Sequence, residues 1–378
     1  MTNTNDIILP FNDGSPGWRG EPVRPVRVAV QPPERLDVGH AFEVPPEPLD
    51  FVLPGMKAGS VGSIVAAGAT GKSMMAVQLA VALAGGKDTL ELGKAGADWT
   101  PGCGEVLYLS GEDPADILSG RLHSIGAHLD AEQRERVAQH LHIWPLSGIG
   151  ARLDDYEWRK AIEEGAADKR LVILDTLRRF HEKDENDGGE MSAIISMMEK
   201  ICLATGASFL FLHHTSKASA LGGTAGEQQA SRGSSVLTDN VRWQSNLSTM
   251  SEKEAAKAGI TDERRRYVRM SFPKINYSAP IGDRWFVRGK GGVLLPAPQA
   301  VADLVAGSIT KGQAGCGGGG GRKAKGNAAA APAVAGGDGG DGGDVPMDAT
   351  PMTRLPGPDD DIMRRKGAAG RTYARNDF

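Results

Sequence analysis

Residues 61–73 read VGSIVAAGATGKS, an apolar run that ends in Gly-Lys-Ser. The apolar part predicts a buried strand, the small residues predict a loop, and residues 72–84 predict a helix. The backbone N–H groups of such a loop can close around phosphate oxygens, and the positive end of the helix dipole attracts the same anion. This stretch therefore predicts a site for a nucleoside triphosphate.

Individual roles follow from the chemistry of this loop. We expect Lys72 to reach the β- and γ-phosphates and the Ser73 hydroxyl to bind Mg²⁺. The residue at the usual first glycine of the motif is Ala66, which fits if its φ is negative. A chance Gly-Lys-Ser in an ordinary strand–turn–helix is the alternative interpretation. The residues predicted to contact the nucleotide are Gly68, Ala69, Thr70, Gly71, Lys72, Ser73 and Met74.

Composition limits the kind of protein. A net charge of −4 over 378 residues argues against a uniformly basic nucleic-acid binder, but it leaves room for a local basic channel. Cys103, Cys202 and Cys316 are far apart and odd in number, so they predict neither a disulfide framework nor a metal cluster. The sequence begins without a secretory pattern and has no apolar stretch long enough to cross a bilayer. A cytoplasmic protein without a membrane partner is expected.

Three regions differ in composition. Residues 1–48 are rich in proline and charge and predict a flexible arm, with one strand-like piece at 26–30. Residues 49–300 alternate apolar runs with helical patterns and predict the folded domain. Residues 301–378 contain a glycine-, alanine- and aspartate-rich stretch that predicts a disordered tail.

The middle region predicts an α/β fold with a mostly parallel sheet flanked by helices and antiparallel strands near its C-terminal end. The predicted parallel strands are 62–66, 106–110, 171–174 and 208–212. The predicted helices are 72–84, 115–126, 131–139, 156–165 and 190–205. The predicted antiparallel strands are 266–273 and 284–287.

An acidic pair, Glu112-Asp113, follows the strand predicted at 106–110 after a single glycine. The carboxyl edge of a parallel sheet is where a base would orient the water that attacks a γ-phosphate. We predict Glu112 as this base, with Asp113 as the alternative. The pair can also serve as the acidic N-terminus of the helix at 115–126.

Asp175 ends the apolar run LVILD at 171–175. An aspartate at this place, about a hundred residues after a phosphate loop, is typical of a carboxylate that holds Mg²⁺. Ser73 and Asp175 are therefore the predicted metal ligands.

The run SFLFLHH at 208–214 predicts another buried strand that ends at the same edge of the sheet. We predict that His214 senses the γ-phosphate, with His213 as the alternative; either can instead be a structural histidine. The next twenty or so residues are small and polar, with Lys217 and Arg232 among them. Such a segment suits loose contact with a nucleic-acid backbone, so these two residues are predicted DNA contacts.

These residues together resemble the RecA-like P-loop ATPases, and among them the RepA-type hexameric replicative helicases of IncQ plasmids. The resemblance covers residues 49–296. It rests on the following segments: PLDFVLPGM at 48–56, GATGKSMMAVQLA at 68–80, GEDP at 111–114, LDTLRRFHEKDEN at 174–186, FLHHTSK at 211–217, QQASRGSSVLTDNVRWQ at 228–244 and PKINYSAPIGDRWF at 273–286.

The resemblance implies further roles. Arg242 matches the arginine finger that reaches the nucleotide of the neighbouring subunit, although an ordinary salt bridge would also explain an arginine here. Lys274 resembles a lysine that points across the same interface, but Asn276 stands where its basic companion is expected. Arg178 and Arg179 would line the central channel or pair with nearby acidic residues.

The function implied is an ATP-dependent, Mg²⁺-requiring 5′-to-3′ DNA helicase, a homohexameric ring that moves on single-stranded DNA in plasmid-type replication. A primase or a replication initiator is a further possible partner. A RecA-like recombination or repair ATPase, or an ATP-dependent assembly switch without helicase activity, are the alternatives.

Overall fold

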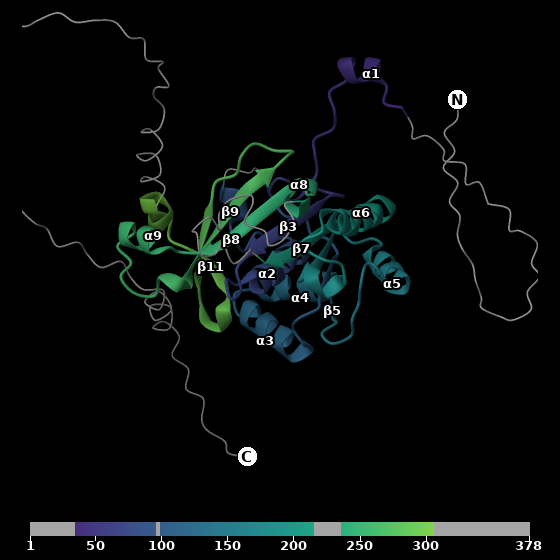
Figure 1. Cartoon of the computed structure of the whole chain (residues 1–378). Helices are drawn as coiled ribbons and strands as arrows, with labels where there is room; N and C mark the ends of the chain where they lie inside the picture. Colours follow the sequence, from purple (N-terminus) through teal and green to yellow (C-terminus); the bar gives the residue numbers. More distant parts are fainter. Residues whose placement is uncertain (1–34, 96–98, 215–235, 306–378) are drawn as a thin grey trace, which may run out of the picture. The chain divides into compact units, whose positions relative to one another are not determined.

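The computed structural model describes residues 35–95, 99–214 and 236–305, in two units that divide between Leu49 and Asp50 (Figure 1). In the first unit, helix α1 (Val38–Glu43) begins where the Asp37 carboxylate accepts a hydrogen bond of 3.0 Å from the His40 amide. All of its side chains are exposed. This helix was not predicted, and the strand expected at 26–30 lies outside the described residues.

The second unit is built on one nine-stranded sheet. Its strands, in spatial order, are β11 (Leu294–Pro296), β10 (Arg284–Arg288), β9 (Tyr267–Ile275), β8 (Trp243–Thr249), β3 (Val61–Ala66), β7 (Ser208–His214), β6 (Leu171–Asp175), β4 (Val106–Ser110) and β5 (Leu141–Pro145). From β8 to β5 all neighbours are parallel, and from β8 to β11 all are antiparallel. A separate two-stranded antiparallel sheet pairs β1 (Phe51–Leu53) with β2 (Met56–Lys57).

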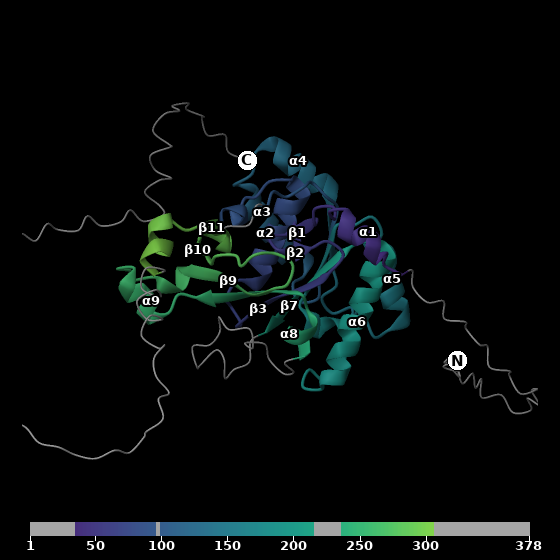
Figure 2. The same cartoon turned by 90° about the horizontal axis from the view of Figure 1, so that it is seen from above.

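Helices cover both faces of the sheet, and Figure 2 shows this layering. The core on one face includes side chains from α2 (Lys72–Gly85), α3 (Ala115–Gly126) and α4 (Ala131–His140). The core on the other face includes side chains from α5 (Tyr156–Ala166), α6 (Gly188–Thr205) and α8 (Val236–Asn240). Alternate residues of a strand point to opposite faces, so Tyr108 of β4 lies in the first core and Leu109 in the second.

Local signals explain where several helices begin and end. Helix α2 ends at Gly86, whose φ of 64° is the left-handed conformation that favours glycine. Helix α4 begins with a capping box, in which the Asp130 carboxylate accepts from the Gln133 amide at 2.8 Å. Helix α6 is capped at its start by Asp187, whose carboxylate accepts a hydrogen bond from the Glu190 amide at 2.9 Å.

The predicted α/β architecture is confirmed, as are the predicted strands that lie within β3, β4, β6, β7, β9 and β10 and the predicted helices α2 to α6. The prediction missed strands β1, β2, β5, β8 and β11 and helices α8 and α9 (Glu252–Lys257). Strand β8 is buried on both faces although its sequence, WQSNLST, is mostly polar. Within the strand, Gln244 Nε2 donates to Asn246 Oδ1 at 2.8 Å.

A third, smaller cluster buries Met250, Trp285, Val301 and Val305, so packed residues continue to the end of the described chain. Helix α9 (Glu252–Lys257) contributes Ala255 to this cluster. Among the described residues, no helix has the length and apolar character needed to cross a membrane.

Candidate nucleotide-binding site

The phosphate loop, residues 66–73, connects β3 to α2. Ala66 is the last residue of β3 and its φ is not positive, so alanine is tolerated there as predicted. The turn is made instead by Ala69 and Gly71, whose φ angles are 59° and 102°. No side chain caps the N-terminus of α2. The first amide groups of the helix are therefore available to bind an anion.

Lys72 and Ser73 point into the site from the first turn of α2. Lys72 is buried, and its Nζ lies 3.4 Å from the Ala67 carbonyl oxygen and 3.3 Å from His214 Nδ1. Burial lowers the pKa of Lys72, whereas the nearby charges of Asp175 and Glu112 raise it. The Ser73 hydroxyl donates to Asp175 Oδ1 at 3.2 Å.

Asp175 is fully buried at the end of β6. Its Oδ2 accepts a 2.6 Å hydrogen bond from the hydroxyl of Tyr108, which the sequence analysis missed. Burial raises the pKa of Asp175, while the bonds from Tyr108 and Ser73 lower it. The same burial, followed by the charge of Asp175, raises the pKa of Tyr108 well above its ordinary value. Tyr108 is therefore a protonated donor that orients the carboxylate.

We expect Tyr108→Phe to weaken both folding and metal binding. The change leaves Asp175 Oδ2 buried without its partner, which costs about 1–3 kcal/mol of unfolding free energy. It also raises the pKa of Asp175 further, so the Mg²⁺ concentration for half-maximal hydrolysis rises, most strongly as the pH falls. Urea unfolding and Mg²⁺ titrations of ATPase activity measure the two effects. Tyr156→Phe, at an exposed tyrosine of α5, is the matched control; equal behaviour of the two variants would contradict the assignment.

Glu112 lies at the carboxyl end of β4, next to these residues. Its Oε1 accepts from the Thr176 hydroxyl at 3.1 Å and lies 3.9 Å from Arg179 Nε and 4.0 Å from His214 Nε2. The interaction with His214, then those with Thr176 and Arg179, lower the pKa of Glu112 against the opposing effect of burial. The carboxylate is therefore ionised near neutral pH, as a base requires.

Asp113, the alternative base, has a different environment. Its carboxylate forms an ion pair of 2.6 Å with Arg121 of α3. Because the Asp113 carboxylate is bound to α3 by this ion pair, Glu112 is the better candidate for the base near the phosphate loop.

The two histidines at the end of β7 also separate. His214 contacts Lys72 and Glu112 as described above. His213 is buried, and its Nδ1 lies 3.8 Å from Glu185 Oε1. Successive residues of a strand point to opposite faces, so only His214 joins the site.

Arg242 is exposed. It lies at the amino-terminal end of the parallel strands, whereas Lys72 lies beyond their carboxyl-terminal end. Arg242 immediately precedes β8, which runs parallel to β3, and its backbone amide donates to the carbonyl oxygen of Val61, the first residue of β3. The phosphate loop follows the last residue of β3. At about 3.3 Å per residue, the length of β3 separates the two backbones by roughly 20 Å. The fold does not bring Arg242 to the phosphate loop of its own chain.

Lys274 lies near Arg242 but is held within its own chain. Its Nζ donates to the carbonyl oxygens of Thr238 and Asp239 at 2.8 and 2.9 Å, at the end of α8. Arg178 donates to the His181 carbonyl oxygen at 3.2 Å, and Arg179 faces Glu112. Lys217 and Arg232 lie outside the described residues.

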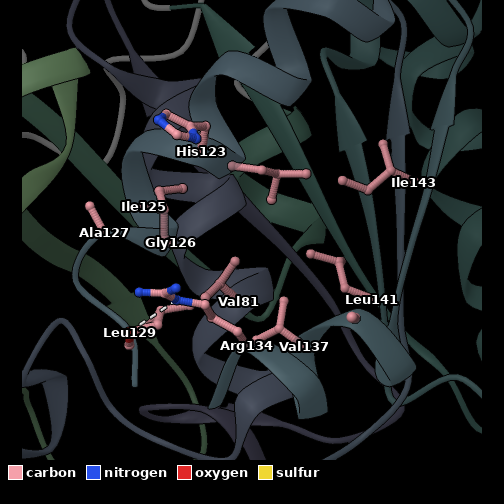
Figure 3. A pocket seen from close by; sticks show the side chains of 12 residues that line it. Val81, His123, Ile125, Gly126, Ala127, Leu129, Arg134, Val137, Leu141 and Ile143 are labelled. Atoms are coloured by element: carbon pink, nitrogen blue, oxygen red, sulfur yellow. Dashed lines mark hydrogen bonds between the residues drawn. The ribbon is translucent and has the colours of Figure 1, made fainter. Parts of the chain in front are cut away.

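A cavity of about 530 Å³ elsewhere in the domain contains none of the predicted site residues (Figure 3). It is lined mainly by apolar side chains of α2, α3, α4 and β5, including Val81, Ile125 and Leu141. Arg134 at its margin donates to the Leu129 carbonyl oxygen at 3.2 Å. The groups suited to phosphate chemistry lie at the carboxyl edge of the sheet instead.

Comparison with known proteins identifies the family. A family model described as an AAA domain matches residues 27–220, just over half of the chain. The chain belongs to this AAA domain family. This AAA domain has an α/β fold with a mostly parallel sheet and a phosphate loop between β3 and α2.

Two solved structures are similar to this AAA domain. One is the ATPase domain of another protein; it is 16% identical, with a TM-score of 0.45, and the match covers 69% of this chain and 96% of that one. The other, the RadB recombinase, is 11% identical, with a TM-score of 0.42, and the match covers 64% and 92% of the two chains.

The donor set of this AAA domain fits magnesium. Ser73 Oγ and Asp175 Oδ1 are hard oxygen ligands within 3.2 Å of each other, next to a loop suited to phosphates. The sequence motifs predict these two residues as metal ligands, but they give no sign of Tyr108 and Thr176, which bond to Asp175 and Glu112. Both act across neighbouring strands, and their residue types alone do not distinguish them from ordinary core and loop residues.

Proposed function

We propose that this AAA domain is an ATP-dependent DNA helicase that works as a homohexameric ring on single-stranded DNA. The 5′-to-3′ direction, the plasmid-replication setting and the specific likeness to RepA-type helicases of IncQ plasmids rest on the sequence motifs. A cytoplasmic setting and a primase or initiator partner belong to the same proposal.

The observation that carries the proposal is the division of the predicted site between the two ends of the parallel strands. Five predicted site residues converge at the carboxyl-terminal ends of the parallel strands: Lys72, Ser73, Glu112, Asp175 and His214. Arg242 is exposed at the amino-terminal ends of these strands. An arginine that cannot reach its own nucleotide suits a site completed by a neighbouring copy, as in a head-to-tail ring.

In the proposed mechanism, ATP binds at the phosphate loop with Lys72 on its terminal phosphates. Mg²⁺ held by Ser73 and Asp175 would neutralise phosphate charge. Glu112 takes a proton from a water molecule, whose oxygen bonds to the γ-phosphorus while the bond to the ADP oxygen breaks. Arg242 of the next subunit stabilises the charge that develops in the transition state.

His214 couples hydrolysis to DNA in this proposal. It contacts both Lys72 and Glu112 and is the last residue of β7. Residues 215–235, with the predicted DNA contacts Lys217 and Arg232, follow it directly in the sequence. Loss of the γ-phosphate would change the contacts of His214 and thereby the grip of this segment on the strand.

The decisive experiment mixes two inactive variants. We expect Lys72→Ala to lose ATP hydrolysis because this lysine is predicted to contact the terminal phosphates. We expect Arg242→Ala to lose it as well, because an arginine finger contributes about 10³–10⁵-fold to the rate. In a one-to-one mixture, roughly a quarter of the sites combine an intact Lys72 with an intact Arg242 across a head-to-tail interface. Partial recovery of ATPase activity is therefore expected. A mixture as inactive as its components would contradict a shared site. Arg242→Lys is the control for charge alone.

Helicase activity itself requires a strand-separation assay. Wild-type protein is expected to unwind a duplex that has a 5′ single-stranded arm. A duplex that has only a 3′ single-stranded arm should not be unwound. If ATP is hydrolysed with DNA present but no duplex is separated, the helicase proposal fails, and particle images of rings or filaments would then test a recombinase.

A further inference from the structure

Arg288, the last residue of β10, reaches the phosphate loop from a part of the chain more than two hundred residues away. Its Nη2 donates to the Ala69 carbonyl oxygen at 3.1 Å and also to the Thr70 carbonyl oxygen. The guanidinium lies over Gly71, where an added Cβ would be 3.6 Å from Nη2. The loop residues it touches include Ala69, which holds a left-handed conformation that costs alanine about 1–2 kcal/mol.

The surroundings fix Arg288 firmly in this place. Arg266 donates from Nε and Nη2 to the Arg288 carbonyl oxygen at 3.2 and 3.1 Å, and it pairs with Glu263 at 2.7 Å. Beyond Arg288, the Gln78 side chain of α2 exchanges two 2.8 Å hydrogen bonds with the backbone of Leu294. The end of β10 is thus tied to its neighbouring turn, and Leu294 of β11, which pairs with Arg288, is tied to the helix that follows the phosphate loop.

Arg288 makes no ion pair with an acidic group in the part of the chain that the structure describes. Burial alone lowers its pKa, with no contribution from a carboxylate, and its Nε is buried without a hydrogen-bond partner. A cation beside the positive end of α2 is unfavourable by itself and becomes favourable when an anion binds there.

A cavity of about 530 Å³ borders the same groups. It is lined by residues 67–70 of the phosphate loop and by Thr249, Glu263, Arg265, Arg266 and Arg288. A ligand bound at the phosphate loop therefore has room beside the guanidinium.

We infer that Arg288 is a positioning residue of the nucleotide site in its own subunit: its bonds to Ala69 and Thr70 hold the phosphate loop in shape, and its charge attracts the nucleotide phosphates. The inference rests on the proposed binding of ATP, but not on helicase activity. Arg288 thereby differs from Arg242, which is proposed to act on the neighbouring subunit during hydrolysis. Binding, rather than the chemical step, is the property that Arg288 should control.

The test compares three variants by direct binding of fluorescent ADP and by steady-state hydrolysis. Arg288→Gln keeps a donor for the loop carbonyls but removes the charge, so we expect Kd and KM to rise about tenfold, with kcat changed less than threefold. The nucleotide affinity of this variant should also depend less on salt than that of the wild type. Arg288→Lys keeps the charge and is expected to recover part of the affinity. Arg265→Gln removes an exposed charge from the same cavity and is the matched control.

Thermal melting without nucleotide separates loss of binding from loss of folding, and only variants that melt within a few degrees of wild type are compared. If Arg288→Gln binds as tightly as Arg265→Gln, or if kcat falls while Kd is unchanged, the inference is wrong. If wild-type protein binds no nucleotide, both the inference and the proposed function fail. If it binds nucleotide but separates no DNA, only the helicase proposal fails, and the binding constants still decide the role of Arg288.

Discussion

Replacing Glu112 by glutamine is expected to slow ATP hydrolysis about 10²–10⁴-fold and to leave ATP binding nearly unchanged. Glutamine preserves the size of the side chain and can still bond to the Thr176 hydroxyl, which lies 3.1 Å from Oε1. It cannot accept a proton from water. A hydrolysis assay under saturating ATP and a binding assay with labelled ATP measure the two quantities separately.

The adjacent carboxylate provides the control for this prediction. Asp113→Asn removes a negative charge one residue away from Glu112. This charge is paired with Arg121 at 2.6 Å, and Asp113 is not the proposed base. We expect this control to lose some stability while hydrolysis falls less than tenfold. If instead Asp113→Asn abolishes hydrolysis and Glu112→Gln does not, the assignment of the base is wrong.

The pH dependence offers a second check on Glu112. Its contacts with His214, Thr176 and Arg179 lower its pKa, so the carboxylate stays ionised as the pH falls to the ordinary range of a free glutamate. The stability that these contacts contribute is present above that ordinary range and is lost as the pH falls through the lowered pKa. In Glu112→Gln this part of the acid dependence of stability should be absent.

Trp243→Ala is expected to lower the free energy of unfolding by about 3–5 kcal/mol, the largest stability effect predicted for this chain. The Trp243 side chain is 1% exposed, and its Nε1 donates to the Pro54 carbonyl oxygen at 2.8 Å. Its ring meets that of Phe272 edge-on, with centroids 6.0 Å apart. It also packs against Gly62, where an added Cβ would lie only 3.0 Å from the indole.

Urea unfolding of Trp243→Ala and Trp243→Phe separates packing from hydrogen bonding. Phenylalanine keeps most of the apolar contact but leaves the Pro54 carbonyl oxygen without its donor, so its cost should be about 1–3 kcal/mol. If Trp243→Ala unfolds at the same urea concentration as wild type, β8 does not have the central role that its position between β3 and β9 implies.

Strand β8 also shows where sequence reasoning fails. Apolar runs such as VLYLS at 106–110 and LVILD at 171–175 identify their strands because both faces of a covered parallel strand are apolar. In β8, by contrast, Gln244, Ser245 and Asn246 are fully buried. Gln244 bonds to Asn246 within the strand itself. Because these residues are polar, no apolar pattern in the sequence predicts their burial.

Local sequence patterns predict the phosphate loop, the carboxylates at the carboxyl ends of β4 and β6, and the alternation of strands and helices. These features depend on neighbouring residues: apolar runs form strands, glycine permits left-handed turns, and polar side chains cap nearby helices. Three features became visible only in the tertiary structure. They are the pairing of Tyr108 with Asp175, the contact of Arg288 with the phosphate loop, and the position of Arg242 at the end of the strands opposite to that loop. Tyr108 and Asp175 are 67 positions apart in the sequence, and Arg288 is at least 218 positions from the loop residues that it contacts. The position of Arg242 depends on the parallel pairing of β8 with β3. Such relations depend on strand order and direction, which packing of the whole domain decides.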